Sequence, residues 1–264
     1  MKKNILALVL LVVSICIVVA YRQIEKNYSD NTPPVIVCET DTVTVSVTTP
    51  VEEFLSGVTA TDKVSGDVTD TIVIENISNF ISENERIVTF AAIDASMNVG
   101  RAERKIIYTD YKEPTFTLSA PLSYVLGTRI DILANIGAKS SLDGSLSDKI
   151  RYGLDNLIDN LAAGEYPIEF RVTDSCGKTS YLNTYIEIYD SSYSGIDVSL
   201  SKYLVYVKKD AKFDASKYYG GSTIDGELTI VSDVNTKEPG TYHVDYFVNG
   251  INAAGKSRLV VVVE

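Results

Sequence analysis

The stretch at residues 166–174 reads YPIEFRVTD, in which apolar and polar side chains alternate before an aspartate. Because successive side chains of a β-strand point to opposite faces of a sheet, this pattern predicts a strand with one buried and one solvated face. Related stretches occur at residues 87–94 (IVTFAAID) and 242–250 (YHVDYFVNG). The sequence therefore predicts one structural unit that occurs three times.

Further elements recur around these strands. Each copy has an opening strand-like run, a turn centred on Gly, and a final apolar strand; the opening runs are 34–37, 114–118 and 196–200, the turns 65–69, 143–147 and 225–229, and the final strands 104–108, 185–189 and 259–263. Many short strands separated by Gly, Pro, Asn and Asp indicate an all-β, antiparallel sandwich architecture. Residues 150–161 have some helical spacing, but their place in the repeat favours a strand and a loop.

The repeats predict three tandem domains after a polar spacer at residues 23–32. We name them domain 1 (33–110), domain 2 (111–190) and domain 3 (195–264). The junction at residues 190–195 is rich in Ser and is expected to be the more flexible of the two junctions.

The N-terminal segment, residues 1–22, is predicted to be a transmembrane anchor or a signal peptide. Lys2 and Lys3 precede a mostly apolar run from Ile5 to Ala20. A helix over this run would be roughly 24 Å long, slightly short of a hydrocarbon core of about 30 Å. The first alternative predicts a single-pass protein of the cell membrane with an extracellular body. The second predicts a secreted protein cleaved after Ala20.

Charge and motif content exclude several functions. The net charge of −11 disfavours a nucleic-acid partner. The chain has no phosphate-binding loop, dinucleotide fingerprint or nucleophile elbow, so we expect no enzymatic activity. Its one histidine, His243, lies in the polar phase of an alternating strand and is expected to be exposed. A lone histidine cannot supply a metal site.

The turns and late strands resemble those of bacterial immunoglobulin-like repeats of cell-surface proteins, of the pesticidal-crystal-protein and hyalin-repeat types. Domain 1 has Asp94 and Asn98 around the closing turn, with Met97 where the family has Gly. Domain 2 keeps Asp174, whereas domain 3 has Asn249 in its place. The resemblance covers about residues 33–264. It implies tandem immunoglobulin-like sandwiches and a location at the cell surface, and it says little about activity.

Tyrosines are the candidate ligand-binding residues. The chain has 17 tyrosines and no tryptophan, and domain 3 is rich in them. Exposed aromatic rings stack on sugars and anchor protein interfaces. Tyr218, Tyr219 and Tyr203 are therefore predicted to bind an extracellular glycan or protein. The alternative is that they fill space in the strands.

Acidic residues suggest a weaker hypothesis, a calcium site. Asp110, Glu113 and Asp174 could gather at the first domain junction, and Asp62 lies in a separate acidic loop. Calcium prefers clustered oxygen ligands. The alternative is that these side chains cap turns, and no calcium-loop motif is present. We therefore expect no cofactor, with calcium as the one candidate.

These observations favour a non-enzymatic bacterial surface protein. We expect domain 3 to act in adhesion or ligand binding while the other two domains hold it away from the membrane. The alternative is a structural stalk or an envelope-assembly spacer with no ligand site of its own.

Overall fold

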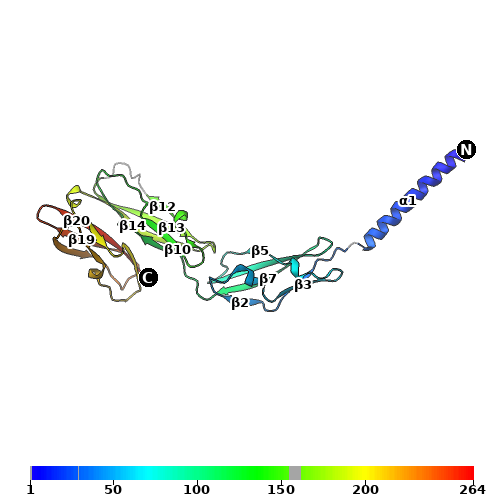
Figure 1. Cartoon of the computed structure of the whole chain (residues 1–264), viewed down its shortest axis with the longest axis horizontal. Helices are drawn as coiled ribbons and strands as arrows, with labels where there is room; N and C mark the ends of the chain where they lie inside the picture. Colours follow the sequence, from blue (N-terminus) through cyan, green and yellow to red (C-terminus); the bar gives the residue numbers. More distant parts are fainter. Residues whose placement is uncertain (1, 29, 155–161) are drawn as a thin grey trace. The chain divides into compact units, whose positions relative to one another are not determined.

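The computed structural model describes residues 2–28, 30–154 and 162–264. The chain divides into two units, Met1–Thr109 and Asp110–Glu264. Its described part contains an N-terminal helix and six β-sheets, which form three sandwich-like domains (Figure 1). The structure therefore confirms the predicted all-β class, with three tandem sandwich-like domains after an N-terminal helix.

Helix α1 runs from Lys2 to Tyr28 and so extends into the predicted spacer. In the part of the chain that the structure describes, no helix combines the length and the apolar character needed to cross a membrane. The transmembrane anchor predicted for residues 1–22 is therefore not supported.

Domain 1 consists of a three-stranded and a four-stranded sheet. In spatial order, the first contains β1 (Val35–Cys38), β3 (Val58–Asp62) and β4 (Gly66–Asp67), and the second contains β2 (Thr42–Val45), β7 (Val99–Tyr108), β6 (Glu85–Ile93) and β5 (Val73–Ile77). Two 3-10 helices, η1 (Val51–Leu55) and η2 (Thr69–Thr71), connect strands. The alternating side chains of β6 bury Val88 and Phe90 between the sheets.

Domain 2 repeats this plan. One sheet contains β11 (Gly144–Ser145), β10 (Ile136–Ser140) and β8 (Thr115–Leu118), the other β12 (Arg151–Leu154), β13 (Gly164–Thr173), β14 (Thr179–Tyr189) and β9 (Ser123–Val125), with η3 (Ser147–Lys149) between β11 and β12. Strand β12 confirms the strand predicted at the start of residues 150–161, and residues 155–161 lie outside the described chain.

Domain 3 has a two-stranded and a four-stranded sheet. The first contains β15 (Val198–Leu200) and β17 (Tyr219–Ser222), the second β16 (Leu204–Val207), β20 (Ala254–Val263), β19 (Gly240–Asn249) and β18 (Glu227–Ser232). The 3-10 helices η4 (Ser191–Tyr193) and η5 (Ala215–Tyr218) precede β15 and β17. The fully buried Tyr246 of β19 is the largest side chain of its core.

The sequence predicts purely antiparallel sandwiches, but each sandwich also contains one parallel pair of strands. In each domain a short strand pairs in parallel with the last strand: β2 with β7, β9 with β14, and β16 with β20. In domain 1, only three residues separate β1 from β2, so the chain crosses to the second sheet without reversing its direction. The crossing strand therefore runs parallel to the last one.

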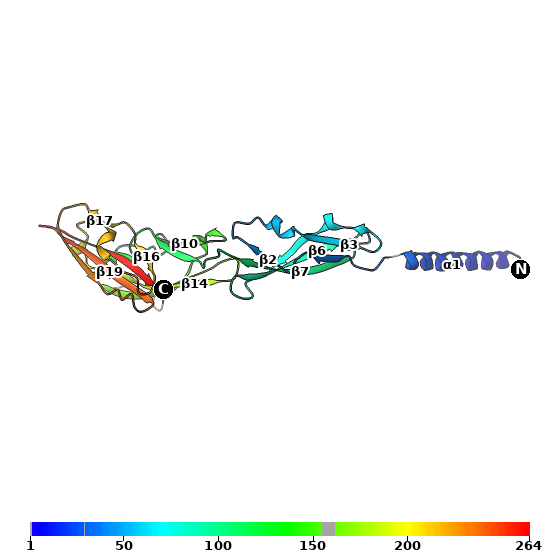
Figure 2. The ribbon, with the colours of Figure 1, turned by 90° about the horizontal axis from the view of Figure 1, so that it is seen from below.

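The segment that joins domains 2 and 3 contacts strand β20, and Figure 2 shows strands of the two domains next to each other. The side chain of Asp190 accepts a hydrogen bond from the N–H of Ser192, which caps η4. Ser194 then forms a bridge with Gly255 of β20. A Cβ on Gly255 would lie 2.1 Å from the carbonyl oxygen of Ile196, so this close approach requires glycine. The junction that the sequence suggests to be the more flexible of the two is therefore held against β20 by backbone contacts.

Candidate functional site

Domain 3 packs the outer face of its larger sheet against domain 2. The register of β19 and β20 pairs His243 with Val260 and Asp245 with Arg258, which places these four side chains on the face turned away from the core of domain 3. Val260 joins the hydrophobic core of domain 2, as does Leu204 of β16. The two domains therefore share apolar packing as well as a chain junction.

Charged side chains of both domains meet at this contact. Arg258 Nε lies 2.7 Å from Asp245 Oδ1, and its Nη1 lies 2.7 Å from Glu165 Oε1 of domain 2. Glu187 pairs with Lys256 and lies 3.5 Å from Arg258 Nη2. Burial opposes the charge on Arg258, but Asp245, Glu187 and Glu165 outweigh it and raise the pKa of the guanidinium. Arg258, Lys256 and Glu187 thus form a buried and largely charge-compensated centre, with Glu165 at its exposed edge.

His243 lies at the same contact and not, as predicted, on an exposed face. Its Nε2 is 3.0 Å from Thr184 Oγ1, and its ring meets the ring of Tyr185 edge to face at a centroid distance of 5.6 Å. Burial and the nearby Arg258 lower the pKa of His243. The polar phase of β19 faces domain 2, which explains why the alternation alone misplaced this residue.

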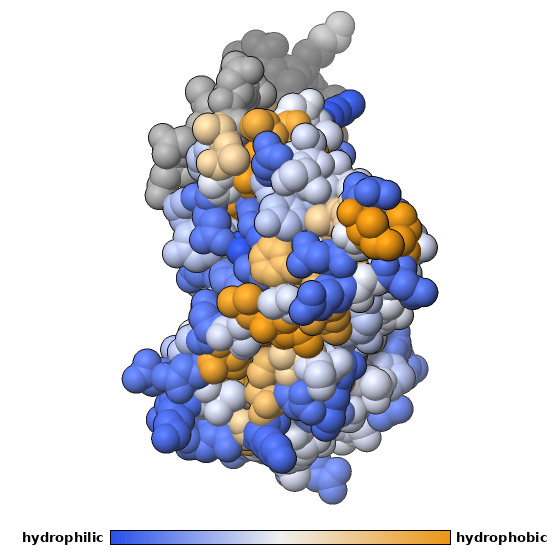
Figure 3. Space-filling model, turned by 90° about the vertical axis from the view of Figure 1, so that its left-hand side faces the viewer, coloured by the Kyte–Doolittle hydropathy of each residue, from blue (hydrophilic) through white to orange (hydrophobic). Residues whose placement is uncertain are grey.

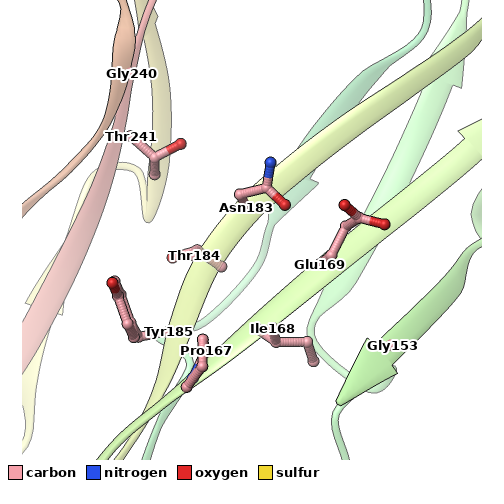
Figure 4. Close-up of a pocket in the computed structure, with 9 residues that line it drawn as sticks. All are labelled: Gly153, Pro167, Ile168, Glu169, Asn183, Thr184, Tyr185, Gly240 and Thr241. Carbon is pink, nitrogen blue, oxygen red and sulfur yellow. The ribbon is translucent and has the colours of Figure 1, made fainter. Parts of the chain in front are cut away.

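A crevice of about 670 Å³ opens beside the domain contact. Figure 4 shows Glu169 and Asn183 on the neighbouring strands β13 and β14, Tyr185 further along β14, and Thr241 on β19 across the crevice. The remaining lining residues of this set are Gly153, Pro167, Ile168, Thr184 and Gly240. One wall comes from domain 2 and the other from domain 3, so the fixed junction sets the width of the crevice.

The exposed tyrosines lie mainly on domain 2. Tyr181 is 58% exposed and Tyr185 is 40% exposed, both on β14, and Tyr152 of β12 is exposed as well. In domain 3, Tyr206 alone among the described tyrosines is exposed, and aliphatic side chains supply the other large apolar exposed groups. On the face shown in Figure 3, apolar patches are interrupted by hydrophilic residues. Domain 2 therefore has more exposed tyrosines than domain 3, although the sequence suggests the tyrosine-rich domain 3 as the binding domain.

The three predicted ligand-binding tyrosines are half-buried and pack against the core of domain 3. The ring of Tyr218 stacks on Phe213 at a centroid distance of 5.7 Å. The hydroxyl of Tyr219 donates to Ser222 Oγ at 3.1 Å, and that of Tyr203 accepts from the N–H of Leu200 at 3.4 Å. None of the three lines the crevice, and their role in binding stays a prediction.

The predicted calcium candidates of domain 2 have other partners. Asp174 is buried and accepts hydrogen bonds from the N–H groups of Cys176 and Lys178 and from the hydroxyl of Tyr111. Glu113 lies 3.7 Å from Lys178 Nζ. Within the described residues, no cluster of three metal-ligating side chains includes either carboxylate or Asp110.

Such a cluster occurs in domain 1 instead. Asp30, Asp62 and Asp94 each place one carboxylate oxygen within 4.8 Å of those of the other two. Of these three residues, the sequence suggests calcium only for Asp62, and it places Asp30 in the polar spacer. A usable signal was that Asp30 precedes an expected first strand while Asp62 and Asp94 end strands, so all three lie at one end of a sandwich.

Comparisons with known proteins give only distant matches. No family model matches the sequence, and no curated protein does. Among solved structures, the chain is similar to the CBM51-2 domain in complex with GlcNAc and INT domains from Clostridium perfringens ZmpB, with 14% identity over 88% of this chain and 42% of that one, and a TM-score of 0.24. It is also similar to protocadherin gamma B2 extracellular cadherin domains 1–5, with 11% identity over 89% of this chain and 61% of that one, and a TM-score of 0.23. A third similar structure is mouse cadherin-23 EC22–24, with 12% identity over 89% of this chain and 99% of that one, and a TM-score of 0.23.

The chain therefore spans less than half the length of the ZmpB structure that it matches. Similarity at these TM-scores carries no argument about function. The predicted resemblance to immunoglobulin-like repeats is confirmed only as tandem β-sandwich domains.

Proposed function

We propose that this protein is a non-enzymatic, extracellular adhesion-type protein of bacteria that binds a neutral glycan in the crevice between domains 2 and 3. The observation that carries the proposal is the crevice itself, with Tyr185, Asn183 and Glu169 on one wall and Thr241 on the other. Export by the N-terminal segment, as a signal cleaved after Ala20, would bring the domains outside the cell.

The lining has the chemistry that a sugar needs. A tyrosine ring offers an apolar surface with a polar end, which suits a sugar ring and its hydroxyls. Asn183 supplies both donors and acceptors, and Glu169 supplies acceptors. Ligand sites at domain contacts commonly have volumes of roughly 300–1,000 Å³ with a few convergent polar groups. The crevice falls within that range.

The charged contact between the domains supports binding by fixing the two walls. Arg258 bridges Glu165 and Asp245, which belong to different domains. A site whose walls are already positioned loses less entropy when a ligand binds.

The lining supports binding over catalysis. Among the described residues that line the crevice, Glu169 is the one carboxylate. Glycoside hydrolysis usually requires a pair of carboxylates on either side of the scissile bond.

Binding of the full chain to a glycan array, including cell-wall and mucin glycans, tests the proposal. Tyr185→Ala and Asn183→Ala should each weaken retention about tenfold or more, because each variant removes one well-placed contact with the glycan. Tyr181→Ala is the matched control, because Tyr181 is an exposed tyrosine of the same strand outside this crevice. Equal losses in all three variants, or loss only with Tyr181→Ala, would overturn the crevice as the site.

A structural spacer is the second candidate function. The fixed junction at Ser194 and Gly255 favours it, because a spacer must hold a set angle between neighbouring domains. Absence of retention on every glycan, together with unchanged folding of the chain, would support the spacer over the adhesion-type protein.

A further inference from the structure

Three carboxylates converge at one end of domain 1. Asp30 lies in the segment before β1, Asp62 ends β3, and Asp94 follows β6. One oxygen of each lies within 4.8 Å of one oxygen of each of the others. Asp62 is 8% exposed and Asp94 is 5% exposed, so like charges are brought together in a largely dehydrated place.

Hydrogen bonds use only part of these carboxylates. Asp62 Oδ1 accepts from the N–H groups of Val64 and Ser65, at 2.8 and 2.6 Å. Asp30 Oδ1 accepts from the N–H and the hydroxyl of Thr32. The second oxygens, Asp62 Oδ2 and Asp30 Oδ2, are buried and have no hydrogen-bond partner. Buried polar atoms are rarely left in this state, so these two oxygens indicate a missing partner.

The third carboxylate is held by its own turn. Asp94 Oδ1 accepts from the N–H groups of Ser96 and Asn98, both at 2.8 Å, and Oδ2 accepts from Asn98 Nδ2 at 2.7 Å. Burial opposes ionisation of Asp94, but these hydrogen bonds outweigh it and lower its pKa. Among the described residues, no Lys or Arg forms an ion pair with any of the three carboxylates.

Domain 2 shows how the same end of a sandwich looks without the extra charges. Ser140 takes the place of Asp62, since it ends β10 as Asp62 ends β3, and its Oγ accepts from Leu142 and Asp143. Asp174 takes the place of Asp94 and binds the same turn positions.

The second oxygen of Asp174 accepts from the hydroxyl of Tyr111 at 2.5 Å, and Tyr111 comes from the segment before the first strand, as Asp30 does. Burial and this hydrogen bond raise the pKa of Tyr111, which keeps the phenol protonated. Domain 2 thus satisfies the second oxygen of Asp174 with a neutral donor, whereas in domain 1 the second oxygens of Asp62 and Asp30 have no donor.

We propose that Asp30, Asp62 and Asp94 bind a divalent metal cation, calcium, at this end of domain 1. All three side chains offer oxygen ligands, which hard cations prefer, and the set contains no sulfur or nitrogen ligand that would favour zinc. The cation is the partner of the two buried oxygens and neutralises the formal charge of −3. It joins the segment before β1 to the ends of β3 and β6.

Calcium binding to the full chain, measured by equilibrium dialysis and by thermal unfolding in calcium or in EDTA, tests the proposal. We expect one bound calcium and a raised unfolding temperature of the Met1–Thr109 unit, because a ligand that binds only the folded state stabilises it. Asp62→Asn keeps an oxygen for the turn hydrogen bonds. It should weaken calcium binding about tenfold or more, since even mutation of a residue that only hydrogen-bonds a metal ligand lowers metal affinity by that factor.

Asp67→Asn is the matched control, because Asp67 is exposed in the same turn region and only caps Thr69. It should leave calcium binding unchanged. In EDTA, Asp62→Asn should lower the unfolding temperature only slightly, because it weakens the charge-assisted hydrogen bonds of the turn. In calcium it should lack the stabilisation that the wild type gains, whereas a residue that only capped the turn would cost the same in EDTA and in calcium. No calcium binding at millimolar calcium, or equal binding by wild type and Asp62→Asn, would overturn the site.

Discussion

Thr184 Oγ1 of domain 2 lies 3.0 Å from Nε2 of His243 in domain 3. This single contact places the one histidine of the chain between two domains, beside the cationic Arg258. A charged imidazole there would be poorly solvated and would face a like charge. Burial and Arg258 therefore favour the neutral form of His243 at the contact between domains 2 and 3, and they lower its pKa.

Mild acid should weaken the Asp110–Glu264 unit through His243. Its pKa is lowered in the folded chain from the ordinary value of 6.5, so the unfolded chain binds the proton more readily. The free energy of unfolding should fall as the pH drops through 6.5 toward the folded pKa, and the full stability is present above about pH 7.5. Urea denaturation between pH 8 and pH 5 measures this. His243→Gln should flatten the profile; an equally steep profile in that variant would assign the effect to another group.

Removing the Arg258 side chain should lower the free energy of unfolding far more than removing an exposed arginine side chain. Arg258→Met leaves the half-buried Asp245 and the buried Glu187 with Lys256 as their remaining cation, and we expect the free energy of unfolding to fall by about 3 kcal/mol. Arg101→Met is the control, because its ion pair with Glu75 is exposed and its removal should leave the free energy of unfolding nearly unchanged. Calorimetric unfolding compares the two, and similar losses would contradict a structural role for the buried network.

Met97→Gly should stabilise domain 1. Met97 has a φ of 67°, in the left-handed region, and its side chain is 75% exposed. Removing the Cβ relieves strain without loss of packing, for a net gain of about 0.5–1 kcal/mol after the entropy of glycine is included. Gly177 holds the same turn position in domain 2 with a φ of 80°, and Gly177→Ala should destabilise by about 1 kcal/mol. Thermal unfolding in EDTA measures both changes, and a loss with Met97→Gly would count against this explanation.

Tyr218 and Tyr219 should affect stability before they affect binding. Both pack against the core of domain 3, so Tyr218→Ala and Tyr219→Ala should each lower the free energy of unfolding by about 1–2 kcal/mol. Tyr219→Phe keeps the ring and should restore most of the loss. If instead Tyr219→Ala abolished glycan retention at unchanged stability, the ligand role predicted from the sequence would be supported over the crevice.

The repeated strands were predictable because alternation reports directly on a two-faced strand. Residues 87–94, 166–174 and 242–250 fall largely within β6, β13 and β19. His243 shows the limit of this reasoning. Alternation separates the core face of a strand from its polar face, but it does not indicate whether a neighbouring domain covers the polar face. The parallel pairs were missed for a related reason: they depend on where the chain crosses between sheets, which leaves no periodic signal.

The carboxylate cluster could be only partly predicted. Asp62 and Asp94 end strands that alternate clearly, but Asp30 lies in a polar segment that composition alone assigns to a spacer. Residues so far apart in sequence meet only through the sheet topology. The crevice depends in turn on how two sandwiches pack, which no single repeat contains.

The parallel pairing of β2 with β7, and of β16 with β20, has a mechanical consequence. In each pair the short strand lies near the start of its domain and the long one ends the domain, so tension along the chain draws the two strands lengthwise in opposite directions. Their hydrogen bonds are then loaded together in shear and do not open one after another. Each of these sandwiches is therefore built to resist stretching between its own two ends, which suits a protein that transmits load along its length.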